Sequence, residues 1–140
     1  MSAGQAAIGQ KPRVSGGRRM GLDFMIQGVE PDYEKNAHWS YSGFNRFRTK
    51  IAALLGIQLD AMSGFGGITA WTTFEDDPIH IFLNHSDCDG KLLPEECAKI
   101  APRLKALIAK LDEEWDRESG ILLTDMMDKC VEADRPLIFC

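Results

Sequence analysis

The side chains best suited to chemistry are concentrated in one twelve-residue segment, residues 85–96. Carboxylates stand at its third and fifth positions, Asp87 and Asp89, and a glutamate ends it at the twelfth. Gly90 at the sixth position allows a sharp turn, and the carbonyl of Lys91 follows at the seventh. Oxygen donors at this spacing are the ligands of a hard divalent cation. The segment therefore predicts a metal site formed by His85, Asp87, Asp89, Lys91 and Glu96.

This segment resembles the calcium loop of the EF-hand family at all but one of its diagnostic positions. At the first position His85 stands in place of the anchoring aspartate. A neutral imidazole suits zinc better than calcium, and a zinc version of the site would add Cys88 and His80. The resemblance thus implies calcium or zinc as a cofactor. The alternative is a tight turn leading into a helix, in which Asp89 supports the turn without any ion.

Residues 38–48 form a second unusual segment, in which aromatic rings, hydroxyl groups and two arginines surround a predicted helix start. Backbone donors at a helix N-terminus attract anions, arginines form paired hydrogen bonds with phosphate or carboxylate, and an aromatic ring can stack on a base. A pocket for a small anionic, nucleotide-like ligand is predicted, with Trp39, Tyr41, Ser42, Arg46 and Arg48 as its residues. The alternative assigns the aromatic rings to the core and the arginines to surface ion pairs.

Motifs of the common enzyme classes are absent from the sequence. It contains no nucleophile elbow, P-loop, dinucleotide-binding fingerprint or zinc-protease helix. A dyad of Cys88 with His85 or His38 can be drawn, but no third group that would orient it is evident. An enzyme is therefore the less favoured class of protein.

Charge and composition limit the classes of partner that the sequence allows. The chain of 140 residues has a net charge of −5, of which residues 1–19 contribute +4, so the remainder carries −9. An acidic body argues against nucleic acid as a partner, except through the basic arm. No apolar run reaches membrane-spanning length and no signal peptide is evident, so a cytoplasmic protein is expected. The four cysteines form no CxxC pair and are expected to be reduced thiols.

The pattern of apolar residues predicts a single α+β domain over residues 20–140, preceded by a flexible arm over residues 1–19. A small, mostly antiparallel sheet is expected to pack against about three helices. The expected strands are residues 22–27, 68–74 and an edge strand in 136–140. The expected helices are 43–55 with Ser42 as N-cap, 94–118 with a kink at Pro102, and 122–133, whereas 79–83 fits either a helix or a strand.

Three phrases in the sequence resemble a group of uncharacterised small proteins of phages and bacteria, over roughly residues 20–140. The phrases are Met20-Gly21-Leu22-Asp23, Trp39-Ser40-Tyr41-Ser42-Gly43-Phe44 and Leu83-Asn84-His85-Ser86-Asp87-Cys88-Asp89-Gly90. The resemblance implies a non-enzymatic accessory protein that sequesters a small anionic ligand or binds a host factor. Two alternatives stay open: a divalent-metal module or metal-dependent enzyme using residues 85–96, and a structural component of a larger assembly.

Overall fold

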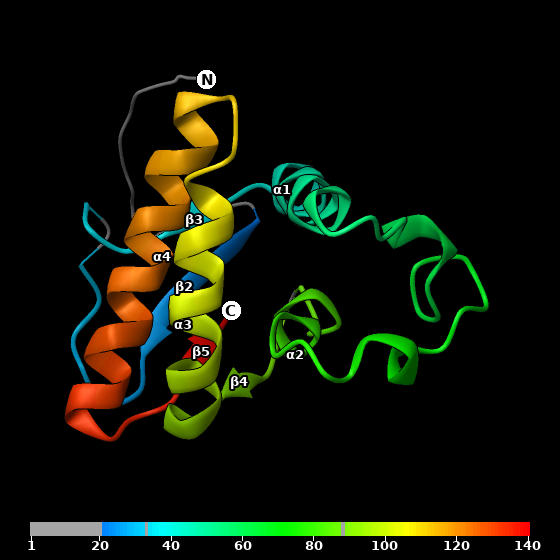
Figure 1. The fold of residues 1–140 in the computed structure, drawn as a ribbon. Coiled ribbons are helices and arrows are strands. Elements are labelled where there is room, and N and C mark those ends of the chain that lie inside the picture. The colour runs from blue at the N-terminus through cyan, green and yellow to red at the C-terminus, as the bar shows by residue number, and fades with distance from the viewer. Residues whose placement is uncertain (1–20, 33, 88) are drawn as a thin grey trace.

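The computed structural model describes residues 21–32, 34–87 and 89–140. The predicted basic arm, residues 1–19, lies outside them, as does Cys88. Two helices lie side by side against a small antiparallel sheet, and a longer excursion of the chain carries the other two helices to one side (Figure 1). The predicted α+β class is therefore confirmed. None of the helices in the described residues is long and apolar enough to cross a membrane.

The sheet has the strand order β3-β2-β5-β4 within the described residues. Its strands are β2 (Leu22–Ile26), β3 (His38–Trp39), β4 (Lys91–Leu92) and β5 (Leu137–Phe139), and all the pairs are antiparallel. Alternate side chains of a strand point to opposite faces. The buried residues follow this period, with Leu22 and Phe24 on β2 and Leu137 and Phe139 on β5.

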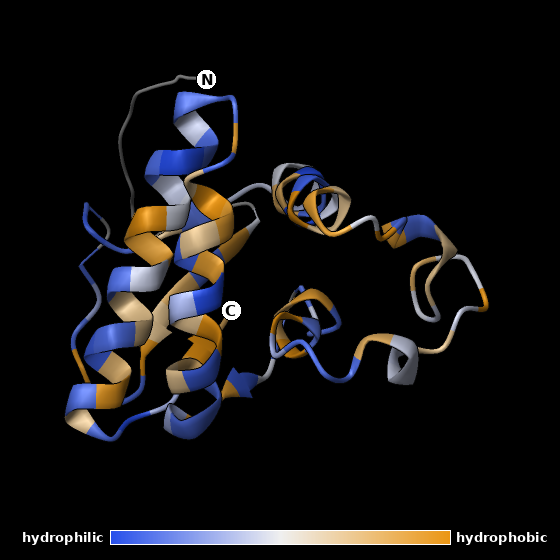
Figure 2. Ribbon diagram, viewed as in Figure 1, coloured by the Kyte–Doolittle hydropathy of each residue, from blue (hydrophilic) through white to orange (hydrophobic). Residues whose placement is uncertain are grey.

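The described residues contain four α-helices: α1 (Tyr41–Leu54), α2 (Ile79–Leu83), α3 (Pro94–Ile108) and α4 (Glu114–Ala133). Helices α3 and α4 form a hairpin whose apolar residues line the sides where the two helices meet (Figure 2). At one point of this contact Gly120 faces Ile108, where an added Cβ would lie 2.6 Å from Cδ1 of the isoleucine. The hairpin is therefore packed so closely here that a larger residue at position 120 would force the isoleucine side chain to shift.

An aromatic cluster joins α1 to the sheet. Phe24 lies in edge-on contact with Trp39, Phe44 and Phe139, at centroid separations of 5.8, 5.7 and 4.7 Å. All four rings are buried, and Phe82 of α2 extends the cluster through Phe44. Edge-to-face aromatic pairs stabilise a core beyond the area that they bury. This cluster therefore fixes the position of α1, on which the candidate site is built.

The prediction of a strand over residues 68–74 was wrong. Trp71–Phe74 forms a 3₁₀ helix, and Thr69 makes only an isolated bridge to Met62. The indole of Trp71 donates a hydrogen bond to the carbonyl of Ser63, which closes the glycine-rich segment on itself. This segment lies away from the sheet (Figure 1), so its β-branched and aromatic residues have no neighbouring strand with which to pair.

The prediction of one helix over residues 94–118 was also wrong. The helix continues through Pro102 but ends at Ile108, and α4 begins at Glu114 rather than near residue 122. Arg117 donates hydrogen bonds from one nitrogen to the carbonyls of Leu111 and Asp112, which satisfies backbone acceptors in the turn between the helices. The apolar spacing continued across this turn, and for that reason the sequence pattern concealed it.

Two further details differ from the expectations. The tail strand β5 lies between β2 and β4 and is not an edge strand. The N-cap of α1 is Ser40, whose hydroxyl accepts a hydrogen bond from the backbone of Gly43, and not Ser42. The strand predicted at 22–27 is present as β2, and the segment that fitted either a helix or a strand is the helix α2.

An ion pair joins the segment just before α2 to α3. Arg103 donates to both carboxylate oxygens of Asp77, with separations of 2.9 Å from Nη2 and 3.1 Å from Nε to Oδ2. Burial alone would raise the pKa of Asp77, but the hydrogen bonds from Arg103 and from the backbone of Ile79 outweigh it and lower the pKa below its usual value of 3.8.

We expect Asp77→Asn to reduce the free energy of unfolding by about 1 kcal/mol at neutral pH, since both partners are partly exposed to solvent. The folded-state pKa is lowered, so the carboxylate stabilises the fold above the unfolded pKa and loses this effect as pH falls through the folded value. Urea unfolding of both proteins should show the difference closing as the pH falls below the usual pKa of 3.8. The exposed Asp76→Asn is the control, and a difference that persists at low pH would contradict the assignment.

Candidate functional site

Two adjoining cavities lie between α1 and the segments that face it. One, of about 290 Å³, is named here the Arg48 cavity and the other, of about 460 Å³, the Asp60 cavity. The Arg48 cavity is lined by Asn45, Arg48, Gly64, Phe65, Asn84, His85, Ser86 and Asp87. The Asp60 cavity is lined by Asn45, Thr49, Ala53, Ile57, Gln58, Leu59, Asp60 and Phe65. Because Asn45 and Phe65 line both, the two cavities adjoin at these residues, and together they are called the groove.

The most unusual residue of this groove is Arg48, whose side chain is only 2% exposed. Its Nη1 atom donates to the carbonyls of Leu83 and His85, at 3.0 and 2.5 Å. The guanidinium lies over the rings of Phe44 and Phe65, at 4.6 and 5.1 Å from their centroids. These contacts hold the group rigidly and tie α1 to the end of α2.

One nitrogen of this guanidinium, Nε, has no hydrogen-bond partner. Both hydrogen bonds of Arg48 to described residues leave from Nη1, and Nε is buried without any acceptor. Nε and Nη2 together form the fork with which arginine binds a carboxylate or a phosphate through two parallel hydrogen bonds. A buried donor without an acceptor is costly, so the unpaired Nε of a side chain that lines a cavity is suited to an anion.

Burial also affects the charge of this group. Desolvation lowers the pKa of Arg48 from its ordinary value to about 10, and the negative charge of Asp87 partly opposes this shift. The guanidinium therefore remains positive at neutral pH while it lacks most of its hydration. Such a charge is stabilised by an anion that binds beside the guanidinium.

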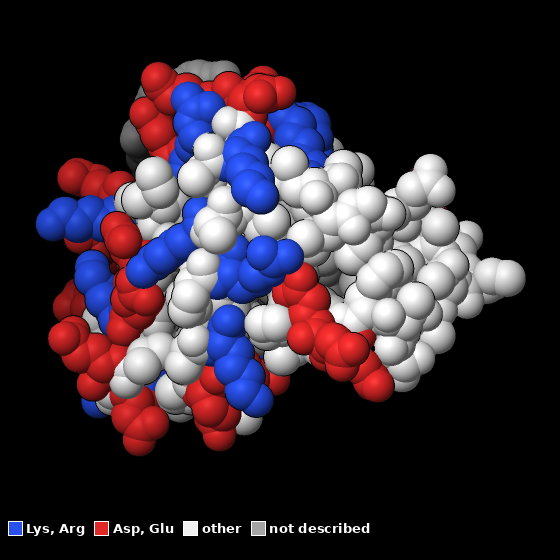
Figure 3. All heavy atoms as spheres, viewed as in Figure 1, with Lys and Arg blue, Asp and Glu red and all other residues white. Residues whose placement is uncertain are grey.

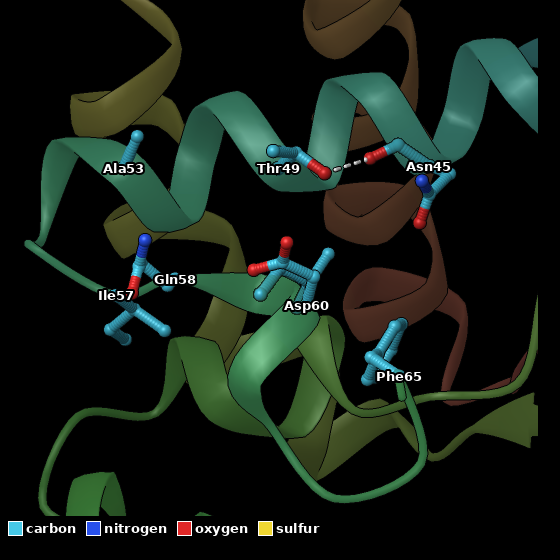
Figure 4. Close-up of a pocket in the computed structure, with 8 residues that line it drawn as sticks. Asn45, Thr49, Ala53, Ile57, Gln58, Asp60 and Phe65 are labelled. Carbon is cyan, nitrogen blue, oxygen red and sulfur yellow. Dashed lines mark hydrogen bonds between the residues drawn. The ribbon is translucent and has the colours of Figure 1, made fainter. Parts of the chain in front are cut away.

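The charged residue that lines the Asp60 cavity is a carboxylate. In Figure 4 the carboxylate of Asp60 points toward α1, whose Asn45 and Thr49 line the facing wall. The hydroxyl of Thr49 donates to the backbone carbonyl of Asn45 at 2.7 Å. The amide of Gln58 lies at one end and the ring of Phe65 at the other, and the buried side chains of Ile57 and Leu59 supply apolar surface.

The five predicted ligand residues do not form one pocket. Trp39 is buried in the aromatic cluster, while Tyr41 and Ser42 at the start of α1 are exposed. Arg46 is exposed, whereas Arg48 is buried in the groove, since residues two apart on a helix point to different sides. Of the predicted set, the groove is lined by Arg48 alone.

The five predicted metal ligands have separate surroundings. The ring nitrogens of His85 face the backbone carbonyls of Ser86 and Lys91, at 2.9 and 3.0 Å, and the ring stacks on Phe139. The Lys91 carbonyl thus lies against the imidazole, and Glu96 accepts from the backbone of Leu93 at 2.8 Å, as in a capping box. Asp87 lines the Arg48 cavity and Asp89 is exposed. Within the described residues, no three His, Cys, Asp or Glu side chains lie together as a metal site.

Asn45, Thr49, Asp60 and Phe65 were not identified from the sequence. One signal was present, because Asn45, Arg48 and Thr49 follow the spacing i, i+3, i+4 and so share one face of α1. Asp60 and Phe65 reach the groove through the irregular segment after α1, whose path no periodicity predicts. The two segments identified as unusual do meet, since Arg48 of the first binds the carbonyl of His85 in the second.

We expect the role of Glu96 to be that of a helix cap. Glu96→Ala should lower the free energy of unfolding by about 1 kcal/mol, while Glu96→Gln keeps an acceptor for Leu93 and should cost less. Adding EDTA, calcium or zinc should leave the melting temperature unchanged. Thermal denaturation checks this, with Glu95→Ala as the control in the same helical turn. A melting temperature lowered by chelator, with Gln as harmful as Ala, would instead establish a metal at this loop.

The surface beside the groove differs in charge from the helical hairpin. Charged residues of both signs cover α3 and α4, whereas the excursion that carries residues 61–74 has no Lys, Arg, Asp or Glu and is uncharged in Figure 3. Phe65 belongs to this uncharged segment and Arg48 lies beside it.

In comparisons with known proteins, no family model, no curated protein and no solved structure matches this chain.

Proposed function

We propose that this protein is a non-enzymatic binding protein for a small molecule that carries a carboxylate or a phosphate. The anionic group lies in the Arg48 cavity and accepts hydrogen bonds from the Nε–Nη2 edge of Arg48. The observation that supports this most directly is the buried, positively charged guanidinium whose Nε has no acceptor.

The rigid placement of the Arg48 guanidinium supports a binding function. The guanidinium is held by two carbonyls and two aromatic rings before any ligand arrives. A donor fixed in this way loses little side-chain entropy when it binds, which increases affinity. Asn45 and Asn84 add amide groups at the cavity wall that can donate to the remaining oxygens of an anion.

Arg48→Lys separates this function from the structural role of the residue. Lysine keeps the positive charge and can donate to the two carbonyls, but it lacks the planar fork. Isothermal titration with inorganic phosphate and with acetate should show saturable binding to the wild type and at least about tenfold weaker binding to Arg48→Lys. Arg46→Lys, on the exposed side of the same helix, should bind like the wild type.

Melting curves of both variants show whether each is folded. Binding of phosphate and acetate that is equal in wild type and Arg48→Lys would refute the proposal, as would a wild type that binds neither anion.

A further inference from the structure

We infer that the ligand has two parts, and that its second part is a planar body bearing N–H or O–H donors that occupies the Asp60 cavity. A single phosphate attached to a nucleoside has this chemistry, so the structure assigns a nucleoside monophosphate as the ligand class. The inference rests on the proposed function, because it takes the anion in the Arg48 cavity as its starting point.

The first step of the inference is that the two cavities adjoin each other. Asn45 and Phe65 line both cavities, so a molecule held by its anion at Arg48 extends past these two residues into the larger space. Small-molecule sites usually measure about 300–1,000 Å³. The Arg48 cavity alone, at about 290 Å³, is at the lower limit, and the 460 Å³ beside it supplies room for a body as large as a nucleoside.

The second step is the chemistry of the larger cavity. The carboxylate of Asp60 is an obligate acceptor, and Thr49 has already directed its hydroxyl proton to the carbonyl of Asn45, so its oxygen accepts further bonds. The side-chain amide of Gln58 can either donate or accept a hydrogen bond. A matching body therefore presents donors, as an exocyclic amine or the hydroxyls of a ribose do. Ile57 and Leu59 are buried beneath and favour an apolar face on the same body.

Phe65 sits where the two parts of the ligand would join. Its ring is half-buried, with Arg48 5.1 Å from its centroid and Trp71 in edge contact at 5.9 Å. A ring fixed by two neighbours at the mouth of a polar groove is a platform on which a flat heterocycle can stack.

The charges that line the groove distinguish between nucleotides with one phosphate and nucleotides with several. Arg48 supplies one positive charge to the groove, whereas Asp60 and Asp87 supply two negative charges. Arg48 compensates part of the charge of a single phosphate, but a chain of phosphates would bring further negative charge toward one carboxylate or the other. The groove therefore favours a monophosphate over a triphosphate.

The test is isothermal titration of the full chain with four probes: inorganic phosphate, adenosine 5′-monophosphate, adenosine triphosphate and glutamine. We expect the monophosphate to bind at least about tenfold more tightly than phosphate or the triphosphate, because a ligand body with paired hydrogen bonds adds more than 1.4 kcal/mol. Repeating the series with the monophosphates of guanosine, cytidine and uridine identifies the base that the groove prefers.

Asp60→Asn is the discriminating variant, since it removes the charge of the acceptor and keeps its shape. It should weaken monophosphate binding about tenfold and leave the affinity for inorganic phosphate unchanged. Asp125→Asn, on the exposed face of α4, is the matched control and should change neither.

The outcomes separate the two proposals. If phosphate binds through Arg48 but none of the monophosphates binds more tightly, this inference fails and the proposed function stands. Tighter binding of the triphosphate, or of glutamine with its carboxylate and amine, would also overturn the nucleotide assignment. If no anion binds, both proposals fail.

Discussion

Replacing Arg48 by alanine is expected to reduce the free energy of unfolding by about 3 kcal/mol. The carbonyls of Leu83 and His85 would lose a charged donor, and hydrogen bonds to charged groups contribute about 1.5–3 kcal/mol each. The aliphatic stem and the guanidinium also fill the space between Phe44 and Phe65, which alanine would leave empty. Part of the loss is offset because the desolvated charge is removed at the same time.

Urea unfolding followed by circular dichroism measures this change. Arg46→Ala is the matched control, because the residue is exposed on the same helix and its loss should change stability by no more than about 0.5 kcal/mol. Arg48→Lys should lie between alanine and the wild type. Equal midpoints for Arg48→Ala and the control would show that the buried contacts of Arg48 contribute nothing to the fold.

Replacing Phe24 by alanine should have a still larger effect, a loss of about 4 kcal/mol. Phe24 is fully buried and contacts three aromatic rings, two from the sheet and one from α1. The substitution removes the transfer free energy of the ring and leaves a cavity that rigid neighbours cannot fill. At such a loss a domain of ordinary stability is close to unfolding.

The same urea experiment tests this prediction, with Trp115→Ala as the control. Trp115 is 63% exposed, so its loss should be nearly neutral although its side chain is larger. A smaller midpoint change for Phe24→Ala than for Trp115→Ala would mean that the aromatic cluster does not form in solution. Phe24→Leu should recover part of the loss, because it refills most of the cavity.

The sequence predicted local elements well where neighbours along the chain decide the structure. The strand at β2 followed from alternation, and Gly56 after α1 adopts the left-handed backbone that often ends a helix, with φ of 75°. The errors arose where the structure depends on residues that are distant in the sequence. Residues 68–74 have the composition of a strand but no strand beside them, and β5 lies at the centre of the sheet because β4, only two residues long, pairs with it.

The candidate site was predictable only in part, for a similar reason. Both unusual segments were identified, but the side chains within them were assigned to a helix start and a metal loop. The buried position of Arg48 depends on α2 and on Phe65, neither of which lies near it in sequence. Helical spacing of Asn45, Arg48 and Thr49 indicated a polar face, and only the fold shows that Asp60 lies opposite that face.

The central place of β5 has a consequence for synthesis on the ribosome. β2 is made near the start of the domain, but its main partner, Leu137–Phe139, emerges only after all four helices have been made. Until then, among the described strands, β2 has the two-residue strand β3 beside it, and its other edge is open to pairing with other chains. The nascent chain is thus expected to need protection from aggregation, by a chaperone or by early packing of β2 against α1.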